Sequence, residues 1–289
     1  MNMRQDKQPV MAAVSAIGEF ETFLRREERS ANTVAKYIRD LRALFSYLDG
    51  REMDKDSLLS WKGYLMESYA PASVNSMLAA VNTFLDFAGL AGWKVKPLKI
   101  QREIFSRPEK ELTREEYRRL VAAAEREKNC RLSLLLQTIC ATGIRVSELP
   151  FITVEALQTG RALVDCKGKT RTVFLPASLV RALHSYCRKQ RIESGTVFCT
   201  RNGRPIDRSN IWRDMKALCE SAGVAPGKVF PHNLRHLFAR TYYELEKDLS
   251  KLADLLGHVN ISTTRIYTME SGGRHAKQLD KMGLVFARL

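Results

Sequence analysis

The stretch AGWKVKPLKIQREIFSRPEKE, residues 91–111, interrupts an otherwise helical hydrophobic pattern and constrains the fold more than any other feature. It contains two prolines and several basic residues. A segment that loses apolar periodicity and gains proline is typical of an interdomain linker. The sequence therefore predicts two domains, residues 1–92 and 112–289, joined by a basic linker at 93–111.

The first predicted domain has the pattern of four helices between about residues 10 and 90. Within NTVAKYIRDLRALFSYLDG, residues 32–50, apolar side chains recur at the spacing of one helix face. Three further segments have a similar pattern: EFETFLRREERS, DKDSLLSWKGYLMESY and SVNSMLAAVNTFLDFAGL. Short polar breaks separate them, which favours a compact helical bundle.

The second predicted domain is helical except for one hairpin. Thr113 and Glu116 have the spacing of a capping box at the start of its first helix. The stretch RALVDCKGKTRTVFLPAS then predicts two short strands on either side of a turn at Lys167-Gly168. Helices resume at SLVRALHSYCRKQ. We therefore expect a mainly α fold with a small β-hairpin: a helical N-terminal domain followed by an α+β domain.

The charge of the chain indicates its class of partner. The formal net charge is +15 and the pI is about 9.7, and the basic residues are spread along the chain. A folded protein with such a field attracts polyanions, and nucleic acid is the leading candidate. A merely basic soluble protein is the plain alternative, and an anionic membrane is weaker because no basic amphipathic anchor helix stands out.

The same sequence predicts a cytoplasmic protein with no membrane partner. No apolar run approaches the roughly 20 residues that span a bilayer. The N-terminus lacks the apolar core of a signal peptide. The six cysteines form no CxxC pair, so we expect neither disulfides nor a metal site.

Two basic motifs have both a plain and a functional reading. In ATGIRVSEL, Arg145 and Glu148 form an i, i+3 pair, which on a surface is worth only a few tenths of a kcal/mol. Alternatively, Glu148 holds the Arg145 guanidinium as a fork for a phosphate. In CKGKTRTVFLP, Lys167, Lys169 and Arg171 are either solvated charges or groups that reach a DNA groove and donate a proton.

Two further motifs lie in the last third of the chain. In FPHNLRH, residues 230–236, both histidines and Arg235 share one helical face, which is harder to assign to packing than a lone histidine. In LLGHVNISTTRIYT, His258 follows the glycine at which a helix ends. We expect Ser262 to cap a second short helix in which Ile266 packs inward and leaves Tyr267 free to point elsewhere.

These four motifs occur in the order Arg, Lys, His-x-x-Arg, His, Tyr. That order, over residues 141–268, resembles the tyrosine recombinases, a family that includes phage integrases and Xer-type recombinases. The N-terminal helices and the linker resemble the family's core-binding domain more loosely. The resemblance implies a site-specific DNA recombinase that cleaves and rejoins strands through a 3′-phosphotyrosyl intermediate and a Holliday junction.

The resemblance also implies roles for individual residues. Tyr267 attacks the scissile phosphate and releases a 5′-hydroxyl, while Arg145 and Arg235 grip the non-bridging oxygens. Lys167 protonates the departing oxygen, and Lys169 is the alternative because the hairpin is one residue shorter than the common form.

The remaining implied roles surround this reaction. His232 assists proton transfer with the tyrosine, and His258 donates a hydrogen bond to the phosphate. Glu148 supports Arg145, while Lys169 and Arg171 contact DNA.

The implied chemistry uses no cofactor. The arginines supply positive charge in place of a metal, and the covalent link conserves the energy of the phosphodiester, so ATP is not required. The implied partners are double-stranded DNA with a specific core site and three further protomers, forming a homo-tetramer or a hetero-tetramer with a related recombinase. The tail AKQLDKMGLVFARL would dock on a neighbouring protomer, or pack in cis.

Two alternatives share part of this pattern. A type IB topoisomerase uses the same chemistry, and the chain's Xer-like size argues against it. A catalytically inactive DNA-binding regulator would keep the charge and the fold, but every expected catalytic position is filled.

Overall fold

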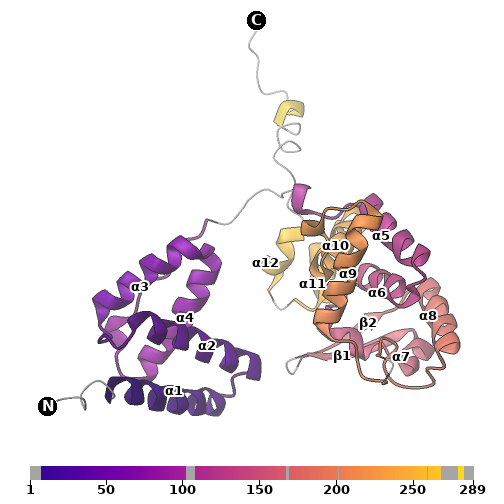
Figure 1. The fold of residues 1–289 in the computed structure, drawn as a ribbon. Helices are drawn as coiled ribbons and strands as arrows, with labels where there is room; N and C mark the ends of the chain where they lie inside the picture. The colour runs from indigo at the N-terminus through magenta and orange to yellow at the C-terminus, as the bar shows by residue number, and fades with distance from the viewer. Residues whose placement is uncertain are drawn as a thin grey trace, which may run out of the picture. The chain divides into compact units, whose positions relative to one another are not determined.

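The structure is a computed structural model that describes residues 8–101, 108–166, 169–200, 202–258, 260–267 and 279–282. The chain divides into two compact units, Met1–Arg102 and Glu103–Leu289. Over the described residues both units are helical, and the second also contains one two-stranded antiparallel sheet (Figure 1). The predicted mainly α fold with a small hairpin is therefore confirmed. In the same described residues, no helix is long and apolar enough to cross a membrane.

The first unit consists of the four predicted helices, and local sequence signals set where they begin. Ser30 and Asp54 each accept a main-chain N–H at a helix start, and a proline opens the fourth helix. The elements are α1 (Gln8–Arg26), α2 (Ala31–Leu48), α3 (Lys55–Ser68), α4 (Pro71–Phe87) and the 3₁₀ turn η1 (Ala91–Trp93).

The core of the first unit is apolar and rich in aromatic rings. Phe20 and Phe84 meet edge to face with ring centroids 5.3 Å apart, and Trp61 of α3 is 1% exposed. Aromatic side chains bury large areas, so they account for much of the apolar surface that this small helical bundle removes from water.

Part of the predicted linker packs on the first unit. The side-chain amide of Asn82 accepts from the main-chain N–H of Val95 and donates to its carbonyl, each at 2.9 Å. Asn75 makes the same pair of bonds to Leu98, at 2.7 and 2.9 Å. Val95 is also 2% exposed. The loss of periodicity after residue 91 therefore reflects an extended segment held by asparagine side chains, which helical spacing cannot detect.

The second unit contains the remaining helices and the hairpin. Its helices are α5 (Arg114–Arg126), α6 (Cys130–Thr142), α7 (Val154–Thr159), α8 (Ala177–Gln190), α9 (Arg208–Ala222), α10 (Pro231–Glu246), α11 (Leu249–Leu256) and α12 (Ile261–Thr264). Short 3₁₀ segments are η2 (Pro108–Lys110), η3 (Val146–Phe151), η4 (Pro226–Lys228) and η5 (Arg265–Tyr267). The strands are β1 (Arg161–Cys166) and β2 (Lys169–Phe174).

Packing between α6 and α10 forms the centre of the second unit. The predicted capping box of Thr113 and Glu116 is present at the start of α5. Asn233 in the first turn of α10 donates to the carbonyl of Lys110 at 2.9 Å, so the start of this unit is fixed to α10. Arg235, in the first turns of α10, donates to the carbonyl of Gly143, so the start of α10 lies beside the end of α6.

The hairpin has one face toward the core and one toward solvent. Ala162 pairs with Val173 and Val164 with Arg171 across the antiparallel ladder. Directly opposed residues lie on the same face of a sheet. Because Ala162, Val164 and Val173 are buried, Arg171 is also on the core face.

Candidate active site

Arg145 lies just beyond the end of α6. The helix ends at Gly143, whose φ of 64° is in the left-handed region that glycine favours. A Cβ at Gly143 would meet Phe238 Cδ1 at 2.4 Å, so only glycine allows α10 to approach this turn. Arg145 then precedes η3, and the Glu148 carboxylate accepts from it twice: the Arg145 N–H donates to Oε2 at 2.9 Å and its Nη1 to Oε1 at 2.8 Å.

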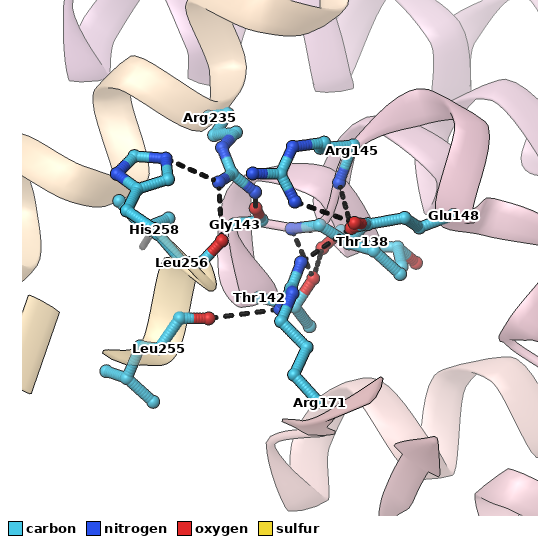
Figure 2. Close-up of polar contacts among 11 residues, drawn as sticks. Thr138, Thr142, Gly143, Arg145, Glu148, Arg171, Arg235, Leu255, Leu256 and His258 are labelled. Carbon is cyan, nitrogen blue, oxygen red and sulfur yellow. Dashed lines mark hydrogen bonds and ion pairs between the residues drawn. The ribbon is translucent and has the colours of Figure 1, made fainter. Parts of the chain in front are cut away.

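Glu148 also binds Arg171, which reaches it from the hairpin. Arg171 Nη2 donates to Glu148 Oε2 at 2.5 Å, and its Nη1 donates to the carbonyl of Leu255 at 3.0 Å. The Arg171 side chain is 12% exposed. The sequence predicted a DNA contact for Arg171; its guanidinium is instead directed into the second unit (Figure 2).

Arg235 is the most enclosed of the three arginines, at 2% exposed. It lies in the first turns of α10, which begins at Pro231. Its guanidinium donates to the carbonyl of Gly143 and, at 2.8 Å, to the carbonyl of Leu256. Both acceptors belong to helix C-termini, where unpaired carbonyls carry partial negative charge. Arg235 therefore joins the ends of α6 and α11 (Figure 2).

We call Arg145, Glu148, Arg171 and Arg235 the arginine cluster; it holds three guanidinium groups and one carboxylate. Burial alone would raise the pKa of Glu148, but hydrogen bonds from Arg145 and the charges of both neighbouring arginines outweigh it and lower that pKa. Burial, with the charge of Arg145, lowers the pKa of Arg235 to about 10. Three guanidinium groups against one carboxylate give the cluster a positive excess that suits an anion.

His258 follows Gly257 at the end of α11 and binds Arg235. Its Nε2 lies 3.1 Å from Arg235 Nη2. A guanidinium has donors only, so Nε2 accepts this hydrogen bond. Nδ1 then carries the proton and donates to Thr264 Oγ1 at 2.9 Å. Burial and the charge of Arg235 lower the pKa of His258 to about 4, which keeps the imidazole neutral at pH 7.

Tyr267 lies inside the second unit, and two expectations about its surroundings were wrong. Ile266 is 42% exposed and Tyr267 is 3% exposed, the reverse of the prediction. The short helix α12 is capped by Asn260, which accepts from the N–H of Ser262, and not by Ser262. Because η5 has about three residues per turn, Tyr267 falls on the same face as Thr264, which is fully buried.

The Tyr267 ring contacts two histidines of its own chain. Its centroid lies 4.7 Å from that of His236, edge to face, and 6.0 Å from that of His258, nearly parallel. The phenol is also among the groups that raise the pKa of Arg235, against the larger effect of burial. Tyr267 is therefore close to Arg235 within a single chain.

His232 and His236 form the last side of the site. Their ring centroids are 4.5 Å apart. Burial, then the neighbouring His232, lowers the pKa of His236 to about 4. Burial, then the charges of Arg235 and Arg145, also lowers the pKa of His232. The sequence placed His236 on the face of Arg235 but gave it no role; its spacing of four from His232 was the available signal.

The structure thus brings together five of the predicted catalytic residues: Arg145, His232, Arg235, His258 and Tyr267. Lys167 lies outside the described residues. The main chain of Lys169 pairs with Cys166, but its side chain lies outside the description. The roles of these two lysines remain predictions. Most of the tail after Tyr267 also lies outside the described residues, so its docking remains a prediction.

This arrangement suits an attack on a phosphate. A phenol with an ordinary pKa near 10 is a weak nucleophile at neutral pH. Guanidinium groups that are already oriented stabilise the charge that develops on phosphoryl oxygens without reorganising during the reaction. A tyrosine beside such a cluster is typical of enzymes that form a phosphotyrosyl link.

A fold of two mainly helical units and a site that groups arginines, histidines and a tyrosine define the class of tyrosine recombinases. Residues 110–273 match the phage integrase family, and residues 17–92 match the N-terminal SAM-like domain of phage integrases. The tyrosine recombinase XerA of Thermococcus kodakarensis is 31% identical over 280 residues, covering 93% of this chain and 95% of XerA. The chain belongs to the phage integrase family of tyrosine recombinases and is a site-specific recombinase.

Solved structures agree with this fold. The XerH site-specific recombinase in a pre-cleavage complex with its difH substrate matches with a TM-score of 0.69 and 19% identity, covering 99% of this chain and 91% of that chain. A lambda integrase tetramer bound to a Holliday junction matches with a TM-score of 0.70 and 19% identity, covering 89% of this chain and 78% of that chain.

Proposed function

We propose that this recombinase cleaves DNA through Tyr267 of its own chain. The phenol oxygen attacks the scissile phosphorus, a 3′-phosphotyrosyl bond forms, and the bond from phosphorus to the 5′ oxygen breaks. The observation that carries the proposal is the position of Tyr267 beside Arg235, His236 and His258 within one chain.

In this proposal Arg145 and Arg235 hold the phosphate. The Arg145 side chain is 37% exposed, so an incoming phosphate can reach it, and Glu148 keeps its fork oriented. Arg235 is fixed by carbonyls that do not cancel its charge. Phosphoryl transfer depends chiefly on such positioning and charge stabilisation.

Proton transfer completes the step. Lys167, or Lys169 in its place, gives a proton to the departing 5′ oxygen, and His232 assists removal of the phenolic proton. His258 has a further requirement, because its Nε2 accepts from Arg235 in the free protein. It can donate to a phosphate oxygen only after it gains a proton, and the negative charge of the phosphate favours that change.

The partners of the proposal are double-stranded DNA with a specific core site and other recombinase protomers. We infer that residues 1–92 and residues 112–289 both bind the core site, with 93–111 joining them. Attack by the 5′-hydroxyl of a second DNA end then regenerates a phosphodiester without ATP. Four protomers, identical or including a related recombinase, act on two sites through a Holliday junction, as in the lambda integrase tetramer. The reaction takes place on DNA in the cytoplasm.

The test is covalent capture. A pool of duplexes with a randomised 30-base-pair core and scattered nicks is incubated with the protein in EDTA, and DNA that stays bound after denaturation is recovered and sequenced. A nick beside the cleaved phosphate lets the short product leave, which traps the adduct. Wild type should enrich one core sequence and Tyr267→Phe none. Tyr243→Phe, a partly buried tyrosine of α10, is the matched control and should behave as wild type. An adduct that survives in Tyr267→Phe would contradict the proposal.

A further inference from the structure

Arg171 is a hairpin arginine whose contacts lie within the second unit. Its Nη2 donates to Glu148 Oε2, and its Nη1 donates to the carbonyl of Leu255, 84 positions along the chain. The same carboxylate binds Arg145 through its other oxygen. Glu148 is 1% exposed, so it is a fixed link between the two arginines.

The Arg171 side chain also lies directly against the turn that carries His258. A Cβ at Gly257 would meet Arg171 Cδ at 2.4 Å and Nε at 2.9 Å. Gly257 has a φ of 64°, so glycine serves both the left-handed turn and the close approach of the arginine. Arg171 therefore touches the elements that present Arg145 and His258.

We propose that Arg171 is a positioning residue for strand cleavage, which orients Arg145 through Glu148 and fixes the turn of His258 through Leu255. This inference rests on the proposed function, because its effect is expressed in the rate of phosphotyrosyl formation. It replaces the DNA contact expected from the sequence: a guanidinium that is 12% exposed and directed inward is poorly placed to bind a DNA backbone.

A purely stabilising role accounts less well for these contacts. A buried ion pair is often no more stabilising than an apolar pair of the same size, because both charges lose their hydration. A planar guanidinium can reach a carboxylate and a carbonyl at once, whereas a lysine ammonium is a single point charge. Arg171 makes both kinds of contact at once, to the Glu148 carboxylate and to the Leu255 carbonyl.

The experiment compares Arg171→Met and Arg171→Lys with wild type on the duplex recovered by covalent capture. Single-turnover adduct formation at saturating duplex reports positioning, and duplex affinity across a salt series reports phosphate contacts. Arg171→Met should slow adduct formation by about 10- to 100-fold, less than the roughly 10²- to 10³-fold loss of a donor that contacts the reacting oxygen, because Arg171 acts through Glu148 and Leu255; affinity and its salt slope should be unchanged. Arg171→Lys should fall between Arg171→Met and wild type.

Two further variants show where the effect arises. Arg161→Met removes an exposed arginine of the same hairpin that lies over the ring of Phe174, and adduct formation should stay at the wild-type rate. In a Glu148→Gln background, Arg171→Met should cause a smaller loss than in wild type, because the link to Arg145 is already weakened and only the contact to Leu255 remains to be lost. Free guanidinium ion should restore part of the rate in Arg171→Ala, which leaves space for it.

The outcomes separate the possibilities. A weaker affinity with a shallower salt slope, and an unchanged rate at saturation, would make Arg171 a DNA contact and overturn the proposal. An unchanged rate with only a lower melting temperature would make it a structural residue and also overturn it. Absence of any adduct in wild type would overturn the proposed function, and this inference with it.

Discussion

Asp40 in the first unit and Glu148 in the second are the two carboxylates that the described residues bury, at 3% and 1% exposed. Asp40 pairs with Lys36 within one helix, and Lys36 also donates to the carbonyl of Ser76 on α4 at 3.1 Å. Asp40 also lies 3.6 Å from Arg39 of the same helix, so the link between the two helices comes from Lys36. Glu148 instead divides its two oxygens between arginines from different elements. The difference shows that burial alone does not mark a site, whereas convergence from distant segments does.

The largest effect should come from Arg235, whose guanidinium binds carbonyls at the ends of two helices. Arg235→Ala removes a buried charge from the site, and adduct formation should fall by about 10³- to 10⁵-fold, the range for arginines in phosphoryl transfer. In the first unit, Arg51 also donates to two carbonyls at a helix end, those of Tyr47 and Leu48. Arg51→Ala should leave the single-turnover rate at saturating duplex unchanged. Similar rates of adduct formation in Arg235→Ala and Arg51→Ala would show that these two arginines do not differ in the reaction.

The two buried carboxylates should differ next in stability. Glu148→Gln leaves two guanidinium groups facing each other, and breaking a buried pair costs about 3–5 kcal/mol. Asp40→Asn leaves Lys36, which is 32% exposed and can turn to water, so the cost should be about 1 kcal/mol. Hydrogen exchange in a urea series, read separately for peptides of each unit, measures both values. An equal cost would contradict the expectation that a carboxylate shared by two guanidinium groups is harder to replace than one paired with a partly exposed lysine.

Lowering the pH should destabilise the second unit alone. Burial lowers the pKa of His236 and His258 from the ordinary 6.5 to about 4, so the unfolded chain binds their protons more readily than the folded chain does. Stability is therefore full above pH 6.5 and is lost as the pH falls toward 4. The first unit, Met1–Arg102, contains no histidine.

Between pH 7 and pH 5, protection from exchange, corrected for the intrinsic rate, should fall by about tenfold or more in peptides from the second unit. Protection from exchange should not change in peptides from the first unit. Protonation of Glu148 should reduce stability only at lower pH, because the pKa of Glu148 is itself lowered. A uniform loss across both units would rule out the histidines as its source.

The smallest effect should come from the support of His258. Thr264→Val keeps the shape of a fully buried side chain but removes the hydroxyl that accepts from Nδ1. Losing one hydrogen bond of about 1 kcal/mol should slow adduct formation about fivefold. Thr83→Val removes a hydroxyl that donates within α4 of the first unit and should have no effect on the rate.

The sequence predicted what is local or periodic. The four helices, the hairpin and the pairing of Arg145 with Glu148 follow from spacing over a few residues. The bond from Arg235 to Gly143 spans 92 positions, and spacing carries no information about it; the order of motifs shared with a family implied only a common site for Arg145 and Arg235.

The errors have specific causes. The prediction that Ile266 is buried and Tyr267 is not was the wrong way round. The reason is that the chain passes from a one-turn α-helix into a 3₁₀ turn, which changes the angular step between residues. The inward direction of the Arg171 side chain was not predicted, because three basic residues at a turn suggest a solvated tip. Residues two apart in a strand lie on the same face, and Arg171 is two positions from the buried Val173. The strand pattern therefore indicated that Arg171 faces the core.

The arginine cluster is held largely by main-chain carbonyls, those of Gly143, Leu255 and Leu256. A point substitution at Leu255 cannot delete its carbonyl, so the hydrogen bond from Arg171 tolerates a change of that side chain. Helix length, in contrast, is constrained: one residue inserted into α11 would rotate the carbonyls of Leu255 and Leu256 by about 100° about the helix axis. Relatives of this chain should therefore vary in the side chain at Leu255 more readily than in the length of α11.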